Sequence, residues 1–141
     1  MLAKKIKFTD YKGQEREQTF HFNINETEIT EMQLSQTGTL TALYEKLAET
    51  QDVPRMIKET KRLIMLAYGE ISEDGTRFIK SPELSVAFTQ TEAYNRLFQD
   101  LFSDPKNMKD FIMGILPMNA DQRKSAEQQI NGMIAGPKPV N

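Results

Sequence analysis

The sequence contains no cysteine and no tryptophan, and its only histidine is His21. The lack of cysteine excludes disulfides, thiolate metal sites and cysteine nucleophiles, and it is compatible with a reducing, intracellular setting. A single histidine cannot build a histidine-based metal cluster. We interpret His21, on the polar face of a predicted strand, as a solvated residue. Thiol-based redox enzymes and zinc ribbons are therefore excluded as classes.

Long apolar runs and a basic excess are also missing. No apolar run approaches the roughly 18 residues that a membrane span needs, and no apolar segment precedes a cleavage site at the N-terminus. We therefore expect a soluble, unsecreted protein with no membrane partner. The net charge of −2 does not favour binding to a phosphate backbone, so no nucleic-acid partner is expected. The basic residues within 55–62 are interpreted as a solvated helix face.

Alternating apolar residues predict two strands near the N-terminus. Ile6 and Phe8 share one face of the first, and Phe20, Phe22 and Ile24 share one face of the second. The polar, glycine-containing segment between them predicts a hairpin with a long loop. An isolated hairpin is marginal in water, so this one must pack on the elements that follow.

Apolar stripes at three- and four-residue spacing predict helices after residue 26. Asn25 and Glu28 resemble a capping box in front of the first, and Ser81 and Thr91 are predicted caps further on. Gly69 is predicted to end a helix in a left-handed conformation. The longer helices are predicted over residues 39–51, 53–68, 82–88, 92–102 and 105–116.

These elements predict an α+β fold in one globular domain over residues 1–117. Its β-hairpin, within 1–25, packs on the mainly α-helical segment 26–117. Hydrophobicity falls beyond Pro117, so residues 118–141 are predicted to form a disordered, flexible C-terminal tail in which a last helix can form.

The stretch YGEISEDGTRFIKS, residues 68–81, could hold a cation, cradle a phosphate, carry paired catalytic carboxylates or only turn the chain. In EF-hand register Glu70, Ser72 and Asp74 occupy ligand positions, but Ser81 replaces the bidentate glutamate. One glycine without a following lysine and serine does not make a phosphate loop. The carboxylates lack the apolar enclosure that catalytic pairs need. Asp74 and Gly75 are therefore predicted to form a hairpin turn between two short strands.

Four short motifs mark the second half of the chain: Tyr68-Gly69-Glu70, Arg77-Phe78-Ile79-Lys80, Thr91-Glu92-Ala93-Tyr94 and Gly114-Ile115-Leu116-Pro117. Over about residues 60–117 they resemble the tail assembly chaperones of long-tailed, siphovirus-type bacteriophages and prophages. The N-terminal hairpin is similar too. The resemblance implies a non-enzymatic protein of the host cell cytoplasm, without cofactors. It would bind the tape measure protein and help recruit the major tail protein during tail tube assembly, and it would be absent from the mature virion.

The resemblance also implies a longer form of the protein, made by a programmed frameshift near the end of this reading frame, and this longer form is expected to be a partner of the shorter one. A minus-one slip needs a message of the form X XXY YYZ. Gly136, Pro137 and Lys138 can be encoded as GGC CCA AAA, which contains such a sequence. We therefore place the hypothetical frameshift site at these three residues.

The partner-binding surface is predicted on the last strong apolar stripe, which borders the tail. Methionines are concentrated there, and flexible thioether side chains suit surfaces that must adapt to different partners, although they can equally fill gaps in a core. The alternative function is a structural virion protein, such as a tail-terminator or head-tail connector component. A small hydrolase is disfavoured. The predicted binding residues are Met108, Phe111, Ile112, Ile115 and Met118.

Overall fold

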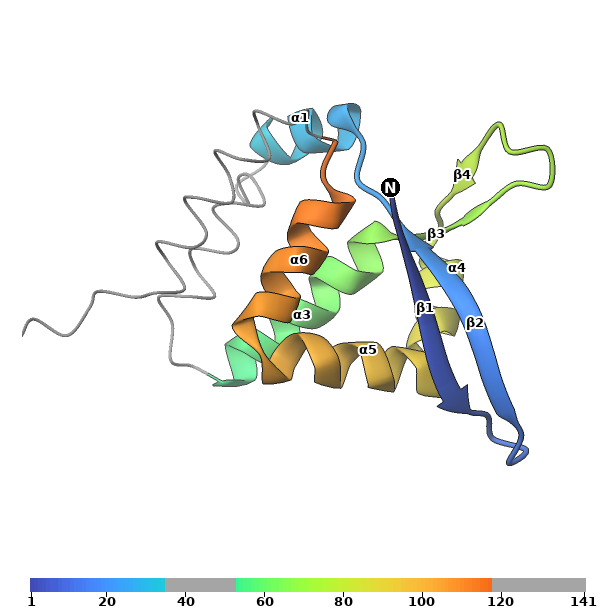
Figure 1. Ribbon diagram of the computed structural model, residues 1–141. Coiled ribbons are helices and arrows are strands. Elements are labelled where there is room, and N and C mark those ends of the chain that lie inside the picture. The colour runs from blue at the N-terminus through green and yellow to red at the C-terminus, as the bar shows by residue number, and fades with distance from the viewer. Residues whose placement is uncertain (35–52, 118–141) are drawn as a thin grey trace, which may run out of the picture.

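The computed structural model describes residues 1–34 and 53–117, and it places helices against one face of a small sheet (Figure 1). The strands are β1 (Leu2–Thr9), β2 (Glu15–Phe22), β3 (Tyr68–Ile71) and β4 (Phe78–Ile79). The helices are α1 (Glu26–Leu34), α3 (Val53–Ala67), α4 (Pro82–Thr89), α5 (Glu92–Ser103) and α6 (Pro105–Ile115). The predicted α+β fold with an N-terminal β-hairpin is confirmed. The predicted helix over 39–51 and the predicted tail over 118–141 lie outside the described residues.

The sheet has the order β1-β2-β3-β4, with antiparallel neighbours throughout. β1 and β2 pair along their whole length, from Leu2 opposite Phe22 to Thr9 opposite Glu15. β3 pairs with only the last two residues of β2. The two hairpins predicted separately are thus joined into one sheet, and most of β2 is left without a second neighbour among the described strands.

Gly69 lies in β3 and does not end a helix. α3 ends at Ala67, and Gly69 has no positive φ, so the prediction of a left-handed stop is wrong. The structure gives a different reason for glycine here. A Cβ at this position would lie 2.6 Å from Cε2 of Phe78 and 2.8 Å from the carbonyl oxygen of Ile79. The glycine is needed because Phe78 and Ile79 of the neighbouring strand β4 leave no room for a Cβ.

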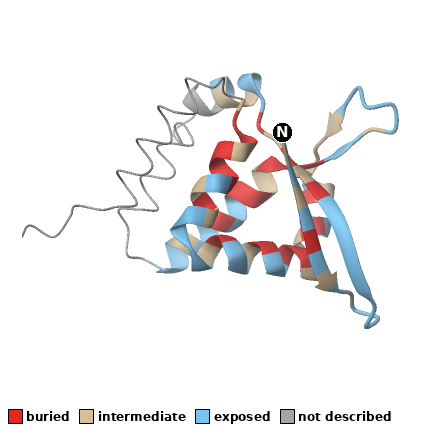
Figure 2. Cartoon of the chain, in the orientation of Figure 1, coloured by how far each residue is buried: buried red, intermediate tan, exposed pale blue. Residues whose placement is uncertain are grey.

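The buried residues lie where the sheet and the helices face one another (Figure 2), and aromatic side chains form a cluster within this core. The ring of Phe22 in β2 lies 5.8 Å from Tyr68, 5.7 Å from Phe88 and 5.3 Å from Phe111, measured between centroids. Tyr68 and Phe88 stack at 4.3 Å. Four elements therefore meet at Phe22, which is fully buried. The apolar pattern of α3 predicts that Ile57 faces inward with Leu63 and Ile64. Leu63 and Ile64 are buried, but Ile57 is 42% exposed, so the prediction is wrong for Ile57.

The helix starts follow from local side-chain caps. Asn25 and Glu28 form the predicted capping box, in which each side chain accepts a hydrogen bond from the other's backbone N–H at 2.8 and 3.0 Å. Ser81 caps α4, Thr91 caps α5 and Asp104 caps α6. No helix within the two described ranges is long and apolar enough to cross a membrane.

A half-buried ion pair ties α1 to the distant segment that joins β4 to α4. Nζ of Lys80 donates to both carboxylate oxygens of Glu28, at 2.9 and 2.7 Å, and to the carbonyl oxygen of Leu66 at 3.0 Å. Glu28 also completes the capping box. One carboxylate therefore starts α1 and holds it against the rest of the fold. We call this arrangement the Glu28–Lys80 bridge.

Candidate protein-binding surface

The predicted binding stripe is part of the core. Met108, Phe111, Ile112 and Ile115 are all buried in α6, and Phe111 packs against Phe22. Met118 lies outside the described residues. Because these four side chains are enclosed by their own chain, binding through them would require α6 to move, and it stays a prediction. A surface that is already exposed has to be sought elsewhere.

The Asp74-Gly75 stretch forms the predicted turn. Gly75 has φ +77°, and Oδ1 of Asp74 accepts the backbone N–H of Thr76 at 3.0 Å and the hydroxyls of Ser72 and Thr76 at 2.8 Å. These hydrogen bonds, led by the Thr76 backbone N–H, lower the pKa of Asp74 to about 2. Each donor comes from the turn itself, so the carboxylate is occupied with holding the hairpin of β3 and β4. No group of three or more potential metal ligands occurs in the part of the chain that the structure describes.

The most prominent exposed feature is the β1–β2 hairpin, which extends past α5 (Figure 1). Its residues from 11 to 19 are all exposed. We call residues 5–19 the arm. Asp10 organises its tip by accepting the backbone N–H groups of Lys12 and Gln14 at 2.9 Å and Nε of Arg16 at 2.6 Å. The Arg16 hydrogen bond is the main reason that the pKa of Asp10 is lowered.

The backbone of β1 has an open edge. The N–H of Asp10 donates to the carbonyl of Gln14 at 2.8 Å, directly beyond the pair of Thr9 and Glu15. Hydrogen-bonded pairs alternate with non-hydrogen-bonded pairs in an antiparallel ladder. Every second residue of β1 therefore directs its N–H and C=O away from β2. These residues are Ala3, Lys5, Lys7 and Thr9.

The arm has a second open edge along β2. The same alternation directs the backbone groups of Glu15, Glu17 and Thr19 to the side where β3 would have to continue. The N–H of Asn23 donates to the carbonyl oxygen of Ala67 at 2.8 Å. This agrees with the alternation, because His21 and Asn23 then both direct their backbone groups toward β3. Since β3 pairs only with His21 and Phe22, the arm is a two-stranded ribbon with unpaired backbone on both sides.

The outer face of the arm is charged and internally paired. Glu17 lies 2.7 Å from Nζ of Lys5 and 3.5 Å from Nζ of Lys7. The hydrogen bond between Lys5 and Glu17 raises the pKa of Lys5 and lowers that of Glu17. Lysines of this kind are a common device for keeping an open strand edge from aggregating.

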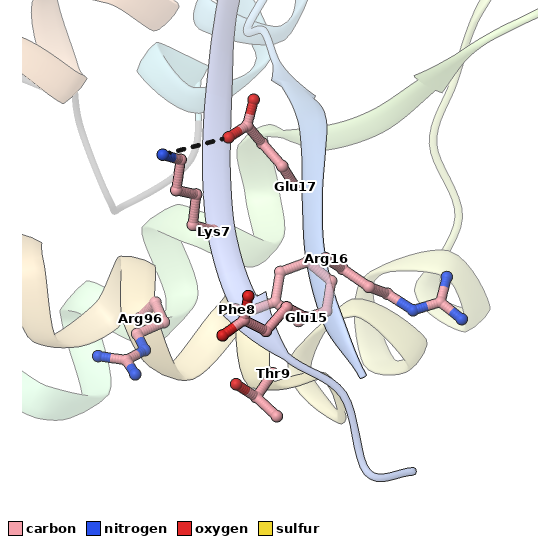
Figure 3. Close-up of a pocket in the computed structure, with 7 residues that line it drawn as sticks. All are labelled: Lys7, Phe8, Thr9, Glu15, Arg16, Glu17 and Arg96. Atoms are coloured by element: carbon pink, nitrogen blue, oxygen red, sulfur yellow. Dashed lines mark ion pairs between the residues drawn. The ribbon is translucent and has the colours of Figure 1, made fainter. Parts of the chain in front are cut away.

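Two adjoining hollows lie beside β1. A shallow basin of about 490 Å³ is lined by both strands of the arm and by Arg96 of α5 (Figure 3). In Figure 3, Arg96 lies on one side of β1 while Arg16 points away on the other. The second hollow, of about 180 Å³, lies between β1 and α5, and we call it the basic cleft. Its lining is Lys4, Lys5, Ile6, Lys7, Arg96, Leu97 and Asp100.

The basic cleft carries more positive than negative charge. Four of its side chains are basic and only Asp100 is acidic, although the whole chain has a net charge of −2. Lys5 and Lys7 share Glu17, but Lys4 and Arg96 form no ion pair with any residue in the described ranges. The edge of β1 therefore borders a cleft that suits negative charge.

Sequence reasoning did not find this surface. In the sequence KKIK only Ile6 contributes to the apolar pattern that predicts the strand, and nothing there marks the lysines as part of a binding surface. Arg96 is far from them in the sequence and reaches the cleft only because α5 packs against β1. The sole signal available was the density of lysine at residues 4, 5 and 7.

His21 is partly buried in β2, and three of the basic residues of α3, Lys58, Lys61 and Arg62, are exposed.

Comparison with known proteins identifies the family. The sequence model described as "Phage tail assembly chaperone" matches residues 1–138, which is nearly the whole chain. No curated protein and no solved structure gives a significant match. The match includes the N-terminal sheet, the open-edged arm and all the described helices. The chain therefore belongs to a family of phage tail assembly chaperones.

Proposed function

We propose that this protein binds the tape measure protein during tail assembly and helps recruit the major tail protein to it. The observation that carries the proposal is the family match over residues 1–138. A tape measure protein offers long amphipathic helices, which need a partner to stay soluble before the tail tube encloses them. The chaperone would cover them by reversible contacts and then be displaced, so it would be absent from the mature virion.

We further propose that the protein acts in the host cell cytoplasm and catalyses no reaction itself. The lone histidine and the lack of cysteine support this, because they leave few ways to build an activated nucleophile.

The longer, frameshifted form of the chain belongs to the same proposal. It would share these residues and add a C-terminal domain after slippage at Gly136, Pro137 and Lys138. The nucleotide sequence of the gene tests this directly. Codons there that cannot form the slippery sequence, with no second reading frame open beyond, would remove the frameshift from the proposal.

Co-expression tests the partner assignment. The tape measure protein from the same gene cluster is expressed alone or with this chain, and its soluble fraction is compared. We expect it to be insoluble alone and to co-purify with the chaperone. Adding the major tail protein should then yield a complex of all three. A tape measure protein that stays equally soluble without the chain, and never co-purifies with it, would contradict the proposal.

A further inference from the structure

We propose that the open edge of β1 accepts an extended acidic segment of a partner protein as an additional strand, with its carboxylates in the basic cleft. Such strand addition uses backbone hydrogen bonds for affinity and side-chain pockets for specificity. The inference rests on the proposed function only for the identity of the partner. The surface and its chemistry follow from the described residues.

The backbone of β1 supplies the first part of the argument. Ala3, Lys5, Lys7 and Thr9 direct their N–H and C=O groups to the free edge. A bound strand would satisfy them and extend the sheet by one strand. The hairpin is already stiffened by pairing from Leu2 to Thr9 and by the Asp10 tip, so little additional ordering of the receiving strand is required.

The cleft determines the charge of the ligand. Side chains of an added strand alternate between its two faces. Those on the α5 side would meet Lys4 and Arg96, which have no ion pair within the described ranges. Those on the outer side would meet Lys5 and Lys7, which Glu17 already partly neutralises. Acidic residues at every second position are therefore the best complement, with their carboxylates on the α5 side.

A second copy of this chain fits less well. If two copies paired through β1 around a two-fold axis, Lys5 and Lys7 of one would lie near the same lysines of the other, and like charges across strands are destabilising. Pairing of β1 in one copy with β2 in the next would set lysines near Glu15 and Glu17. That arrangement is the main competitor, and it uses both edges of the arm.

The test uses the full chain and a labelled peptide in which glutamate alternates with threonine, with a lysine-threonine peptide as the comparison. Fluorescence anisotropy at low salt should show binding of the glutamate peptide at least about tenfold tighter than of the lysine peptide, and the difference should shrink as salt is added. No binding of the glutamate peptide at about millimolar concentration, or equal binding of both peptides, would overturn the proposal.

Proline variants identify the edge. Lys7 and Glu17 form a non-hydrogen-bonded pair, so proline at either position removes an N–H that points outward and leaves the ladder between β1 and β2 intact. Lys7→Pro should weaken peptide binding about tenfold relative to Lys7→Ala. The proline removes one hydrogen bond at the edge, and its ring hinders the neighbouring hydrogen bond to the bound strand. Glu17→Pro blocks the opposite edge and should bind the peptide as Glu17→Ala does, since both variants lose the carboxylate that pairs with Lys5 and Lys7. If both proline variants weakened peptide binding equally, and both also abolished self-association in a sedimentation experiment, the occupant of the edge would be a second copy of the chain. The proposal of an acidic strand would then be overturned.

The charge requirement is tested on the helix, where the strand pairing is not disturbed. Arg96→Glu should weaken the glutamate peptide about tenfold at low salt. Arg77→Glu changes the net charge equally, but at an exposed position directly before β4, and should have little effect. Identical behaviour of the two variants would contradict a role for the cleft. If the chain still solubilises the tape measure protein while the peptide experiments fail, the proposed function stands and this inference alone is rejected.

Discussion

Breaking the Glu28–Lys80 bridge should destabilise the fold more than an ordinary surface substitution. Nζ of Lys80 uses its three protons on Glu28 Oε1, Glu28 Oε2 and the carbonyl of Leu66. The two side chains are only 22% and 24% exposed, so the pair is intermediate between a surface and a buried ion pair. Lys80→Met keeps much of the aliphatic stem, but it leaves the carbonyl of Leu66 without this donor and the half-buried carboxylate with only the backbone N–H of Asn25.

The magnitude follows from what is left unpaired. Exposed ion pairs contribute about 0–1 kcal/mol, whereas breaking a buried pair costs about 3–5 kcal/mol. For this half-buried pair we expect Lys80→Met to lower the free energy of unfolding by about 2 kcal/mol. Against a total stability on the order of 5–15 kcal/mol, that loss is easily measured.

Urea unfolding followed by circular dichroism is the assay. The midpoint should fall for Lys80→Met while the m value stays constant, because the buried surface is unchanged. Lys106→Met, at an exposed position of α6, is the matched control and should change stability by less than about 0.5 kcal/mol. A double-mutant cycle with Glu28→Gln, which keeps an oxygen for the cap, isolates the pair itself. If Lys80→Met is no more destabilised than Lys106→Met, the bridge does not hold α1.

Three further predictions concern the core and the sheet. Phe111→Asp should unfold the chain, because it places a carboxylate against Phe22 and costs more than the about 3–5 kcal/mol expected for Phe111→Ala. A soluble variant with an unchanged melting temperature would contradict this and make α6 a candidate partner surface again. Gly69→Ala should lower the free energy of unfolding by about 1–3 kcal/mol, and by more than Gly114→Ala does. The new Cβ at residue 69 meets a backbone carbonyl, whereas Gly114 faces the flexible side chain of Leu2. Equal melting temperatures of the two variants would contradict this. Burial raises the pKa of Tyr68 to about 12, so stability should fall as the pH rises from 10 toward 12; Tyr68→Phe should lose less stability over that window, and parallel pH profiles would refute the assignment.

Local features of the fold could be predicted from the sequence. The capping box at Asn25 and Glu28, the caps at Ser81 and Thr91, and the turn at Asp74 and Gly75 each depend on residues within a few positions of one another. Short-range hydrogen bonds of this kind leave a clear pattern in the sequence. Those predictions were confirmed by the structure.

Contacts between distant segments could not be predicted. The pairing of β2 with β3 and the bridge between Glu28 and Lys80 join residues that are about fifty positions apart. The distal part of β2 was also interpreted as loop, because both of its faces are exposed and no apolar alternation marks it as a strand. The candidate binding surface could not be predicted for the same reasons. It consists of the arm, part of which was interpreted as loop, and of Arg96, which α5 brings beside the arm.

The stripe on α6 shows the limit of amphipathic patterns. The apolar face of a helix predicts that something covers it, but not whether the cover is a partner or the same chain. Here Phe22 and its neighbours provide much of the cover for Phe111. The candidate binding surface depends instead on lysines and an arginine, which the pattern of apolar residues does not reveal.

The central claim is that this chain binds the tape measure protein during assembly and is not a component of the finished particle. The most direct measurement is quantitative mass spectrometry of two samples from the same infected culture, the purified virions and the tape measure complexes captured from the lysate. We predict that the chain is abundant in the complexes and absent from the virions. Its presence in virions in fixed proportion to the major tail protein would contradict the account, and it would favour a structural role such as a tail terminator or connector.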